Sequence, residues 1–356
     1  MPRINFGRFF HNWLLSRYAG IPYPLNAQIE MTARCNFKCG FCGIHQNRKL
    51  YTDPEMTTDE IKLIIDQLAD LKITTVSLTG GEPLLRPDCG EILTYLRQKG
   101  CIGGLATNGW LLRDRLESGS LKDCEYIMVS LDSVHPAKHD EYRGVPGAWE
   151  HAVEGLKAAR KRHIKCVISS VITRENFGEM EPLAQLAQEL GCSIEIMPCE
   201  DIVREEHGET FRAKEVREKN WIPNLRKWGQ EIRYLIPKYP NLLTDYFTAR
   251  IVEEGGFGNT TFRCNVAQAY IFIRYNGEAN WPCKLHPVLR VNVLKSPIDK
   301  AYRSSEVREI MDMRDSYPFC KDCRLGCAIV ATLTTKFISS FQKFVIGAVR
   351  GNFLDG

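Results

Sequence analysis

Three cysteines near the start of the chain have the type and spacing to hold a metal centre. Cys35, Cys39 and Cys42 form the pattern C-x3-C-x2-C directly after a predicted strand, where parallel α/β folds place their sites. Three thiolates this close together can hold three irons of a 4Fe-4S cluster and leave the fourth iron open. The alternative is a zinc site, for which His45 is near enough to be a fourth ligand. The spacing alone leaves the choice between cluster and zinc open.

A second motif, Thr79-Gly80-Gly81-Glu82-Pro83, ends the second predicted strand. Paired glycines let a ligand approach the backbone closely, and a carboxylate at this position can bind an ammonium group. Taken alone, the motif is better explained as a plain strand-to-helix turn. In combination with the three cysteines, it indicates a ligand site.

With both motifs in order, residues 24–235 resemble the radical S-adenosylmethionine (radical SAM) superfamily. Three later segments carry the resemblance further: Ala106-Thr107-Asn108-Gly109, Ser130-Leu131-Asp132 and His139-Asp140-Glu141-Tyr142-Arg143-Gly144. The resemblance implies an α/β fold, a partial (β/α)6 TIM-like barrel, in which SAM chelates the open iron. It also implies that the reduced cluster cleaves SAM to methionine and a 5′-deoxyadenosyl radical, which abstracts hydrogen from an unactivated C–H bond. The cofactors would carry this chemistry, while the protein positions them.

The resemblance assigns roles to residues around SAM. The segment Gly80–Glu82 is expected to meet the methionine amino group, and Phe41 is expected to pack near the adenine. Ser130 and Asp132 are candidates for the ribose, with strand-end capping as the alternative. Arg143 is a candidate for the SAM carboxylate, with a surface ion pair as the alternative.

A second group of cysteines lies near the C-terminus. Cys264 and Cys283, followed by Cys320-x2-Cys323 and then Cys327, resemble the cysteine-rich extensions called SPASM and twitch. The first four fit the twitch pattern, which binds one cluster, and Cys327 either replaces one of them or stays free. A zinc ribbon is the alternative. The resemblance favours one auxiliary 4Fe-4S cluster, which would accept the electron lost when a substrate radical is oxidised.

The remaining cysteines are scattered. Disulfide scaffolds are usually much shorter than this chain of 356 residues, and the tight clusters are typical of metal ligands. We therefore expect the scattered cysteines to be buried small hydrophobes. They are Cys89, Cys101, Cys124, Cys166, Cys192 and Cys199.

Strand and helix patterns alternate from residue 26 to about residue 235, which predicts a parallel sheet with right-handed crossovers. Periodicity alone does not separate an open sheet from a partial barrel. The predicted strands are Ala27–Met31, Thr75–Thr79, Gly104–Thr107, Tyr126–Leu131, Lys165–Ile172 and Ser193–Met197. The predicted helices are Thr57–Leu71, with a capping box of Thr57 and Glu60, then Cys89–Lys99, Trp149–Lys161 and Met180–Leu190.

Beyond the alternating region, the chain changes character. Residues 213–250 are predicted to form one or two amphipathic helices. Residues 262–327 show little periodicity, so we expect metal more than a core to hold them together. The predicted organisation has four parts: an N-terminal amphipathic segment over 1–23, the barrel over 24–250, an auxiliary-cluster domain over 251–330 and a C-terminal amphipathic helix over 331–356.

The formal net charge of +4 is concentrated at the two ends of the chain, and no central basic stripe predicts nucleic-acid binding. Each end has an aromatic, apolar face opposite a basic face, which is typical of helices on a membrane surface. The alternative is that both ends pack on the barrel. We see no run of 18 apolar residues and no secretory signal. The expected location is therefore the cytoplasm, with peripheral attachment to the inner face of the membrane under the first interpretation.

These patterns predict an oxygen-sensitive radical SAM enzyme that uses a reductant such as ferredoxin or flavodoxin. The favoured substrate is a membrane-lipid hydrocarbon chain, with carbon–carbon coupling or a related modification as the outcome. The alternative substrate is a peptide or protein side chain, as in maturases of ribosomal peptides or sulfatases. A non-catalytic electron carrier would explain the cysteines but not the motif Gly80–Pro83.

Overall fold

A computed structural model of the protein describes His11 and residues 24–200, 203–207, 209–212, 222, 224–314 and 316–335. Apart from His11, the predicted N-terminal segment 1–23 lies outside the described residues, as do residues 336–356 of the predicted C-terminal helix. No helix in the described part of the chain is long and apolar enough to cross a membrane.

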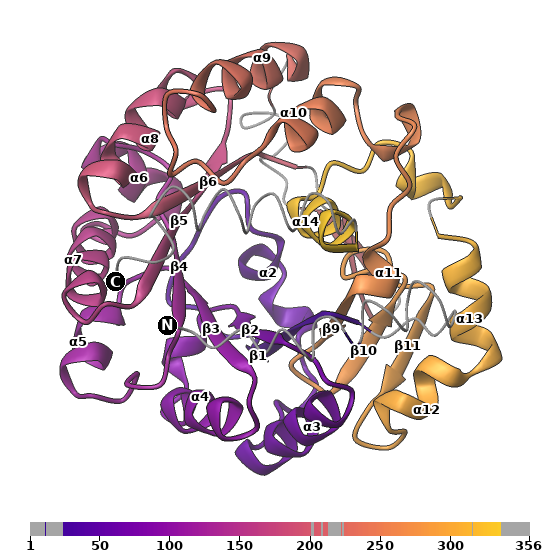
Figure 1. Ribbon diagram of the computed structural model, residues 1–356. Helices are drawn as coiled ribbons and strands as arrows, with labels where there is room; N and C mark the ends of the chain where they lie inside the picture. The colour runs from indigo at the N-terminus through magenta and orange to yellow at the C-terminus, as the bar shows by residue number, and fades with distance from the viewer. Residues whose placement is uncertain are drawn as a thin grey trace.

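The largest feature is a nine-stranded sheet with the order β11-β10-β9-β1-β2-β3-β4-β5-β6, which curves into a partial barrel (Figure 1). Neighbouring strands from β1 to β6 are all parallel. The predicted α/β fold and all six predicted strands are confirmed, with ends that differ by at most two residues. The strands are β1 (Asn26–Thr32), β2 (Thr75–Gly80), β3 (Ile102–Thr107), β4 (Tyr126–Ser130), β5 (Lys165–Ile172) and β6 (Ser193–Pro198).

Helices surround the outside of this sheet (Figure 1). They follow the strands in the order α3 (Thr58–Asp70), α4 (Cys89–Gln98), α5 (Leu112–Glu117), α6 (Pro136–Arg143), α7 (Ala148–Lys161) and α8 (Met180–Glu189). The predicted capping box of α3 is present, because Thr57 N donates to Glu60 Oε2 at 2.7 Å and Glu60 N donates to Thr57 Oγ1 at 3.2 Å. Apolar residues of the helices and strands form one continuous core.

Strand alternation separates this core from the barrel interior. In β1, Ala27, Ile29 and Met31 belong to the core beneath the helices. Successive side chains of a strand point to opposite faces, so Gln28 and Glu30 face the interior. The same alternation places polar side chains of several other strands on the interior face, which we call the lumen. The polar lumen residues are Gln28, Glu30, Ser77, Tyr126, Ser169 and Glu195.

The sheet continues into the C-terminal part of the chain. β9 (Tyr270–Ile273) pairs in parallel with β1, and β10 (Glu278–Trp281) and β11 (Leu289–Asn292) add antiparallel strands. Trp281 and Tyr302 are buried in the same core as the barrel residues. Residues 262–327 therefore contribute to the main apolar core, contrary to the expectation that metal more than a core would hold them together. The missed strands are four residues each, too short for a period-two pattern to stand out.

The remaining elements lie inside the ring, across its open side and against its outer helices (Figure 1). Residues 213–250 contain two helices, as the periodicity allowed, although residues 213–221 lie outside the described part. A short hairpin of β7 (Val203–Glu206) and β8 (Glu209–Arg212) precedes them. The helices are α2 (Gly43–Gln46), α9 (Leu225–Leu235), α10 (Tyr246–Glu253), α11 (Val266–Ala269), α12 (Ile298–Arg303), α13 (Ser305–Asp312) and α14 (Gly326–Thr335).

Candidate functional site

The loop that follows β1 brings Cys35, Cys39 and Cys42 together at the carboxyl end of the strand. Cys39 is buried, and the other two are half-buried. Burial raises the pKa of the Cys39 thiol to about 11, and the charges of Cys42 and Cys35 add to this effect. Cys35 and Cys42 pack against the same small apolar cluster as Cys39, so the three cysteines lie close together.

His45 does not complete a zinc site with these cysteines. Its Nδ1 lies 3.4 Å from Arg48 Nη2, and burial together with the Arg48 charge lowers the pKa of the imidazole. Among the residues that the structure describes, no three Cys, His, Asp or Glu side chains are close enough to hold one metal ion. In a 4Fe-4S cluster each cysteine binds a different iron, so its ligands need not converge on one point. Three thiols without a convergent fourth ligand fit a cluster with one open iron.

Glu82 joins the ends of β2 and β3 from a fully buried position. Its Oε1 accepts hydrogen bonds from Leu84 N at 3.0 Å and Thr107 Oγ1 at 2.8 Å. Its Oε2 accepts one from Asn108 N at 2.7 Å. Burial raises the pKa of this carboxyl to about 7. Glu82 also lies near the cysteine loop, since its negative charge raises the pKa of Cys35.

Gly80 and Gly81 let the end of β2 press against the loop that follows β1. Gly80 has a φ of +140°, and a Cβ there would lie 2.3 Å from the Thr32 carbonyl oxygen. A Cβ on Gly81 would lie 2.2 Å from the Arg34 carbonyl oxygen. Only glycine fits at these distances. In this structure the two glycines make room for backbone, and their contact with the methionine amino group stays a prediction.

Asp132 and Arg143 form a buried ion pair beside the first cysteine group. Arg143 Nη2 lies 2.7 Å from Asp132 Oδ2, and Arg143 Nη1 lies 4.0 Å from Cys39 Sγ. The guanidinium carbon is 5.2 Å from the centre of the Phe41 ring. The side chains of Arg143 and Asp132 are only 9% and 1% exposed, so the alternative of a surface ion pair for Arg143 is wrong. Asp132 Oδ1 also accepts a hydrogen bond from Val171 N at 2.9 Å, which joins β4 to β5.

Arg143 keeps one hydrogen-bond donor unused. Its Nε is buried and has no hydrogen-bond partner among the described residues. Leaving such a donor unpaired is unfavourable, and a carboxylate is a group that a guanidinium binds well. The site therefore fits the carboxylate that the sequence analysis assigned to it. Ser130 lies half-buried at the end of β4, and its contact with the ribose stays a prediction.

His139 supports this pair, and the sequence analysis gave it no role of its own. Asp132 N donates a hydrogen bond to His139 Nδ1 at 3.2 Å. Burial and the Arg143 charge lower the pKa of His139 to about 3, so its imidazole is neutral and Nδ1 can accept. A histidine at the start of the segment His139–Gly144 was the available signal.

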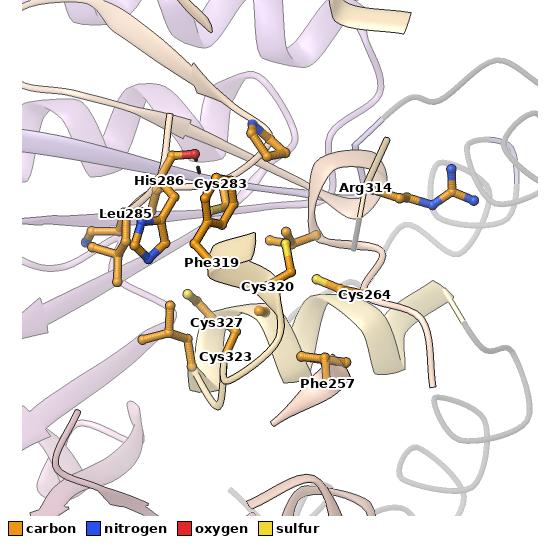
Figure 2. Close-up of a pocket in the computed structure, with 15 residues that line it drawn as sticks. Phe257, Cys264, Cys283, Leu285, His286, Arg314, Phe319, Cys320, Cys323 and Cys327 are labelled. Carbon is orange, nitrogen blue, oxygen red and sulfur yellow. Dashed lines mark hydrogen bonds between the residues drawn. The ribbon is translucent and has the colours of Figure 1, made fainter. Parts of the chain in front are cut away.

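The second cysteine group surrounds a single cavity (Figure 2). Cys264 precedes β9, and Cys283 follows β10, which runs back toward the start of β9. Burial raises the pKa of each of these two thiols to about 12, with a further rise from the charges of neighbouring cysteines. The other three cysteines come from the loop and first turn of α14. The five that line the cavity are Cys264, Cys283, Cys320, Cys323 and Cys327, so Cys327 lies with the others, and which four bind a cluster stays open.

Protein contacts fasten the loop of this second group to the barrel. Arg324 donates from Nε and Nη2 to the two carboxylate oxygens of Glu200, at 2.9 and 2.8 Å, and both side chains are largely buried. Glu200 lies just beyond β6, while Phe257 N donates to Cys323 O at 3.0 Å. The cavity is therefore held in place from two sides by the chain itself.

Two charged residues between the cysteine groups were missed by the sequence analysis. Lys284 Nζ lies 3.7 Å from Glu30 Oε1, and their side chains are 19% and 5% exposed. Lys284 directly follows Cys283 and lines the second cavity, whereas Glu30 lies on the lumen face of β1. The available signal was a single acidic residue in the otherwise apolar second half of a predicted strand, five positions before Cys35.

Comparisons with known proteins agree with this geometry. A family model described as the radical SAM superfamily matches residues 29–187. The AdoMet-dependent heme synthase of Methanosarcina barkeri is 29% identical over 304 residues, which cover 83% of this chain and 86% of that protein. A probable GTP 3′,8-cyclase of Saccharolobus solfataricus is 31% identical over 221 residues, which cover 59% of this chain and 70% of that protein. The crystal structure of Streptococcus suis SuiB bound to S-adenosylmethionine has the same fold, with a TM-score of 0.64 and 19% identity over 89% of this chain and 74% of that chain.

Proposed function

Because this chain belongs to the radical SAM superfamily, and is therefore an enzyme that uses a 4Fe-4S cluster and SAM, we propose that it acts on a C–H bond of a substrate held in its lumen. We further propose that an auxiliary 4Fe-4S cluster completes the reaction. The observation that carries this proposal is the placement of two cysteine groups around one lumen, which is lined by both polar and apolar side chains. A substrate between them would be within reach of both.

Bound cluster and SAM supply the electron and the 5′-deoxyadenosyl radical that removes a hydrogen atom from the substrate. The role of the protein is to hold the cluster and SAM and to exclude water from them. Cys35, Cys39 and Cys42 would hold three irons, while Arg143 would bind the SAM carboxylate through its unused Nε. Asp132 fixes the guanidinium by the ion pair at 2.7 Å.

The remaining SAM contacts follow the assignments made from the sequence. We place the methionine amino group at Gly80, Gly81 and Glu82, the adenine at Phe41, and the ribose at Ser130 and Asp132. The buried carboxylate of Glu82 supports this, because a positively charged amino group nearby would stabilise its ionised form. The half-buried Phe41 ring beside Arg143 supports an aromatic contact in the same place.

We assign residues 251–330 to the auxiliary cluster, with four ligands among Cys264, Cys283, Cys320, Cys323 and Cys327. Four cysteine ligands leave no iron open, so this cluster would serve in electron transfer. The buried thiols, which line one cavity, support this assignment. A reductant such as ferredoxin or flavodoxin would supply the electron that starts each turnover.

The lumen offers hydrogen-bonding groups to a polar substrate, alongside the apolar side chains of Met128, Val167 and Met197. Charged side chains of Glu30, Glu195 and Lys284 lie in or beside it, with the hydroxyl group of Tyr126. A polar substrate can add hydrogen-bond partners to these groups, which a hydrocarbon chain cannot do. A peptide offers such partners, and the relatives named heme synthases make a tetrapyrrole a further class to test.

A lipid chain is the second candidate, and the two ends of the sequence favour it. Both ends combine basic and aromatic residues in the pattern of helices that lie on a membrane surface. Under this proposal the protein sits on the inner face of the membrane, and substrate enters from the bilayer. Sedimentation with anionic vesicles tests it directly. Unchanged vesicle binding after removal of residues 1–23 and 336–356 would leave the lipid proposal without its main support.

The first test separates the two cysteine groups. Cys39→Ser should lose iron from the first cluster and make no 5′-deoxyadenosine, whereas Cys283→Ser should still cleave SAM but fail to complete turnover. Cys166→Ser, at a buried position outside both groups, is the matched control. Iron content, 5′-deoxyadenosine and product are measured anaerobically. A Cys283→Ser protein with normal product yield would contradict the electron-transfer role.

A second experiment identifies the substrate class. Reduced enzyme with SAM is incubated with a peptide pool, a lipid extract or a tetrapyrrole, and Cys39→Ser enzyme serves as the control. Mass spectrometry then looks for a species that has lost hydrogen and forms only with intact enzyme. Loss of hydrogen in the lipid pool alone would overturn the preference for a polar substrate.

A further inference from the structure

Lys284 is a buried cation at the boundary between the lumen and the second cysteine cavity. It directly follows Cys283 and lines that cavity, and its side chain is only 19% exposed. Its Nζ lies 3.7 Å from Glu30 Oε1, donates to Gln28 Oε1 at 3.5 Å and lies 4.5 Å from the centre of the Phe272 ring. These contacts hold the ammonium group beside the cavity, in a place that little water reaches.

The counterion of Lys284 lies on the far side of the ammonium group from the cysteines. Lys284 is one of the residues that line the cavity, whereas Glu30, on the lumen face of β1, is not. The Glu30 side chain is 5% exposed, so water and salt screen the charges of this pair only weakly. Because the cation is the nearer member of the pair, the second cysteine group experiences a positive potential from it.

The other cationic and imidazole side chains of the cavity lining act less directly on the sulfur atoms. Figure 2 shows the Arg314 guanidinium pointing away from the cysteines, and its Nε donates to Asn265 Oδ1 at 3.2 Å. His286 stacks on Phe319 with 4.6 Å between the ring centres. Burial lowers the pKa of His286, so its imidazole is neutral at pH 7. Lys284 is therefore the cation of the lining best placed to act on a metal centre there.

The charge of Lys284 acts on a sulfur atom of this group. Burial raises the pKa of the Cys327 thiol, whereas the Lys284 ammonium lowers it and the carboxylate of Glu195, on the lumen face of β6, raises it. An ammonium group that stabilises a thiolate also stabilises the negative charge of a cluster held by such thiolates. The geometry and the charges thus point to an electrostatic role for Lys284.

We propose that the ammonium group of Lys284 raises the reduction potential of the auxiliary cluster and that Glu30 limits this effect. Reduction adds one electron to the cluster, so a nearby positive charge favours the reduced form over the oxidised form. A higher potential favours the transfer of one electron from a substrate radical to the cluster. The proposal rests on the proposed function, in which four of the five cysteines hold an auxiliary cluster.

Anaerobic redox titration of the full-length protein, followed by electron paramagnetic resonance (EPR) of the reduced cluster, measures this potential. The Cys39→Ser background removes the signal of the first cluster. In that background, Lys284→Met should disfavour the reduced form about tenfold, which lowers the potential of a one-electron couple by about 59 mV. Glu30→Gln should favour the reduced form about threefold. Lys284→Arg, which keeps the charge, should titrate as the background does, and so should the control Lys300→Met, exposed on α12.

The opposite signs expected for Lys284→Met and Glu30→Gln separate an effect of charge from a loss of packing. The proposal is overturned if Lys284→Met leaves the potential unchanged, or if Lys300→Met shifts it equally. If Lys284→Met binds no cluster, Glu30→Gln decides, and an unchanged or lower potential in that variant overturns the proposal. Absence of any cluster from the Cys39→Ser protein, by iron analysis and EPR, would overturn the proposed function. A cluster whose potential is independent of Lys284 and Glu30 overturns this inference alone.

Discussion

Glu82 carries an unusual share of the contacts near the proposed SAM site. It joins the ends of β2 and β3 through three hydrogen bonds, yet no cationic side chain among the described residues forms an ion pair with it. Burial sets its pKa at about 7 against an ordinary value of 4.5. At a pH between these two pKa values, Glu82 is protonated in the folded protein and ionised in the unfolded chain.

This difference makes stability depend on pH. The folded state binds more protons than the unfolded state from about pH 4.5 to about pH 7, so stability falls as pH rises through that window, by about 3 kcal/mol in total. Urea unfolding of the cluster-free protein at about pH 5 and about pH 8 measures the effect. Glu82→Gln should show a smaller loss, since it does not titrate, although it lacks the second acceptor oxygen.

Glu91→Gln on the protein surface is the matched control and should keep the wild-type pH dependence. An equal loss of stability in Glu82→Gln and wild-type protein would contradict the assignment of this dependence to Glu82.

At the residue scale, sequence reasoning reached the residue types but not all their partners. The first cysteine group came from its spacing, which is local information, and the second came from a resemblance to the SPASM and twitch extensions. Asp132 and Arg143 were assigned separate roles, because nothing in one sequence reveals that the end of β4 and the end of α6 meet.

β2 and the loop after β1 pack closely because the glycines at their junction have no side chains. A Cβ on Gly81 would meet the Arg34 carbonyl oxygen at 2.2 Å and the Ala33 carbonyl oxygen at 3.0 Å. Backbone atoms cannot move away from an added Cβ as the end of a flexible side chain can. Cys35 is the residue after Arg34, so a shift here moves a proposed cluster ligand.

Gly81→Ala should therefore lower the free energy of unfolding by about 1–3 kcal/mol and reduce the iron bound per chain. Gly178→Ala is the matched control, because a Cβ there meets nothing within 4 Å, and it should change stability by less than about 0.5 kcal/mol. Thermal unfolding and iron analysis measure both. Equal stability and equal iron content in the two variants would show that the backbone at this junction can shift to accommodate a Cβ.

At the element scale, long periodic segments were predictable and short ones were not. The α3 helix carried both a capping box and a regular apolar face, so it was placed to within a residue. The strands β9, β10 and β11 are four residues each, and they are fixed by pairing with β1 and with one another. Such non-local pairing leaves little trace in the local sequence.

The described part of the chain packs as one unit across the predicted boundary at residue 250. β9 occupies the edge of β1, and core residues from both sides of the boundary belong to one cluster. The four-part organisation stays a prediction as a division of function. In packing, however, the nine-stranded sheet and the main core continue across the boundary at residue 250.

A chain that ends at Glu254 should therefore lose cooperative unfolding, because it exposes the edge of β1 and the core beneath Trp281. A chain that ends at Thr335 keeps every described element and should unfold cooperatively. Near-ultraviolet circular dichroism during urea titration distinguishes the two. A sharp transition in the shorter chain would mean that residues 24–254 fold on their own.

The hydrogen-bonded ladder between β1 and β9, from Asn26 opposite Tyr270 to Ile29 opposite Ile273, has a consequence for how this protein can change over evolution. The interval between the two cysteine groups is built into backbone geometry, so no single side-chain replacement can lengthen or shorten it. Inserting one residue in β1 would turn its lumen side chains toward the helices and its apolar ones inward. New substrates must therefore be accommodated by exchanging lumen side chains and loops against a fixed span.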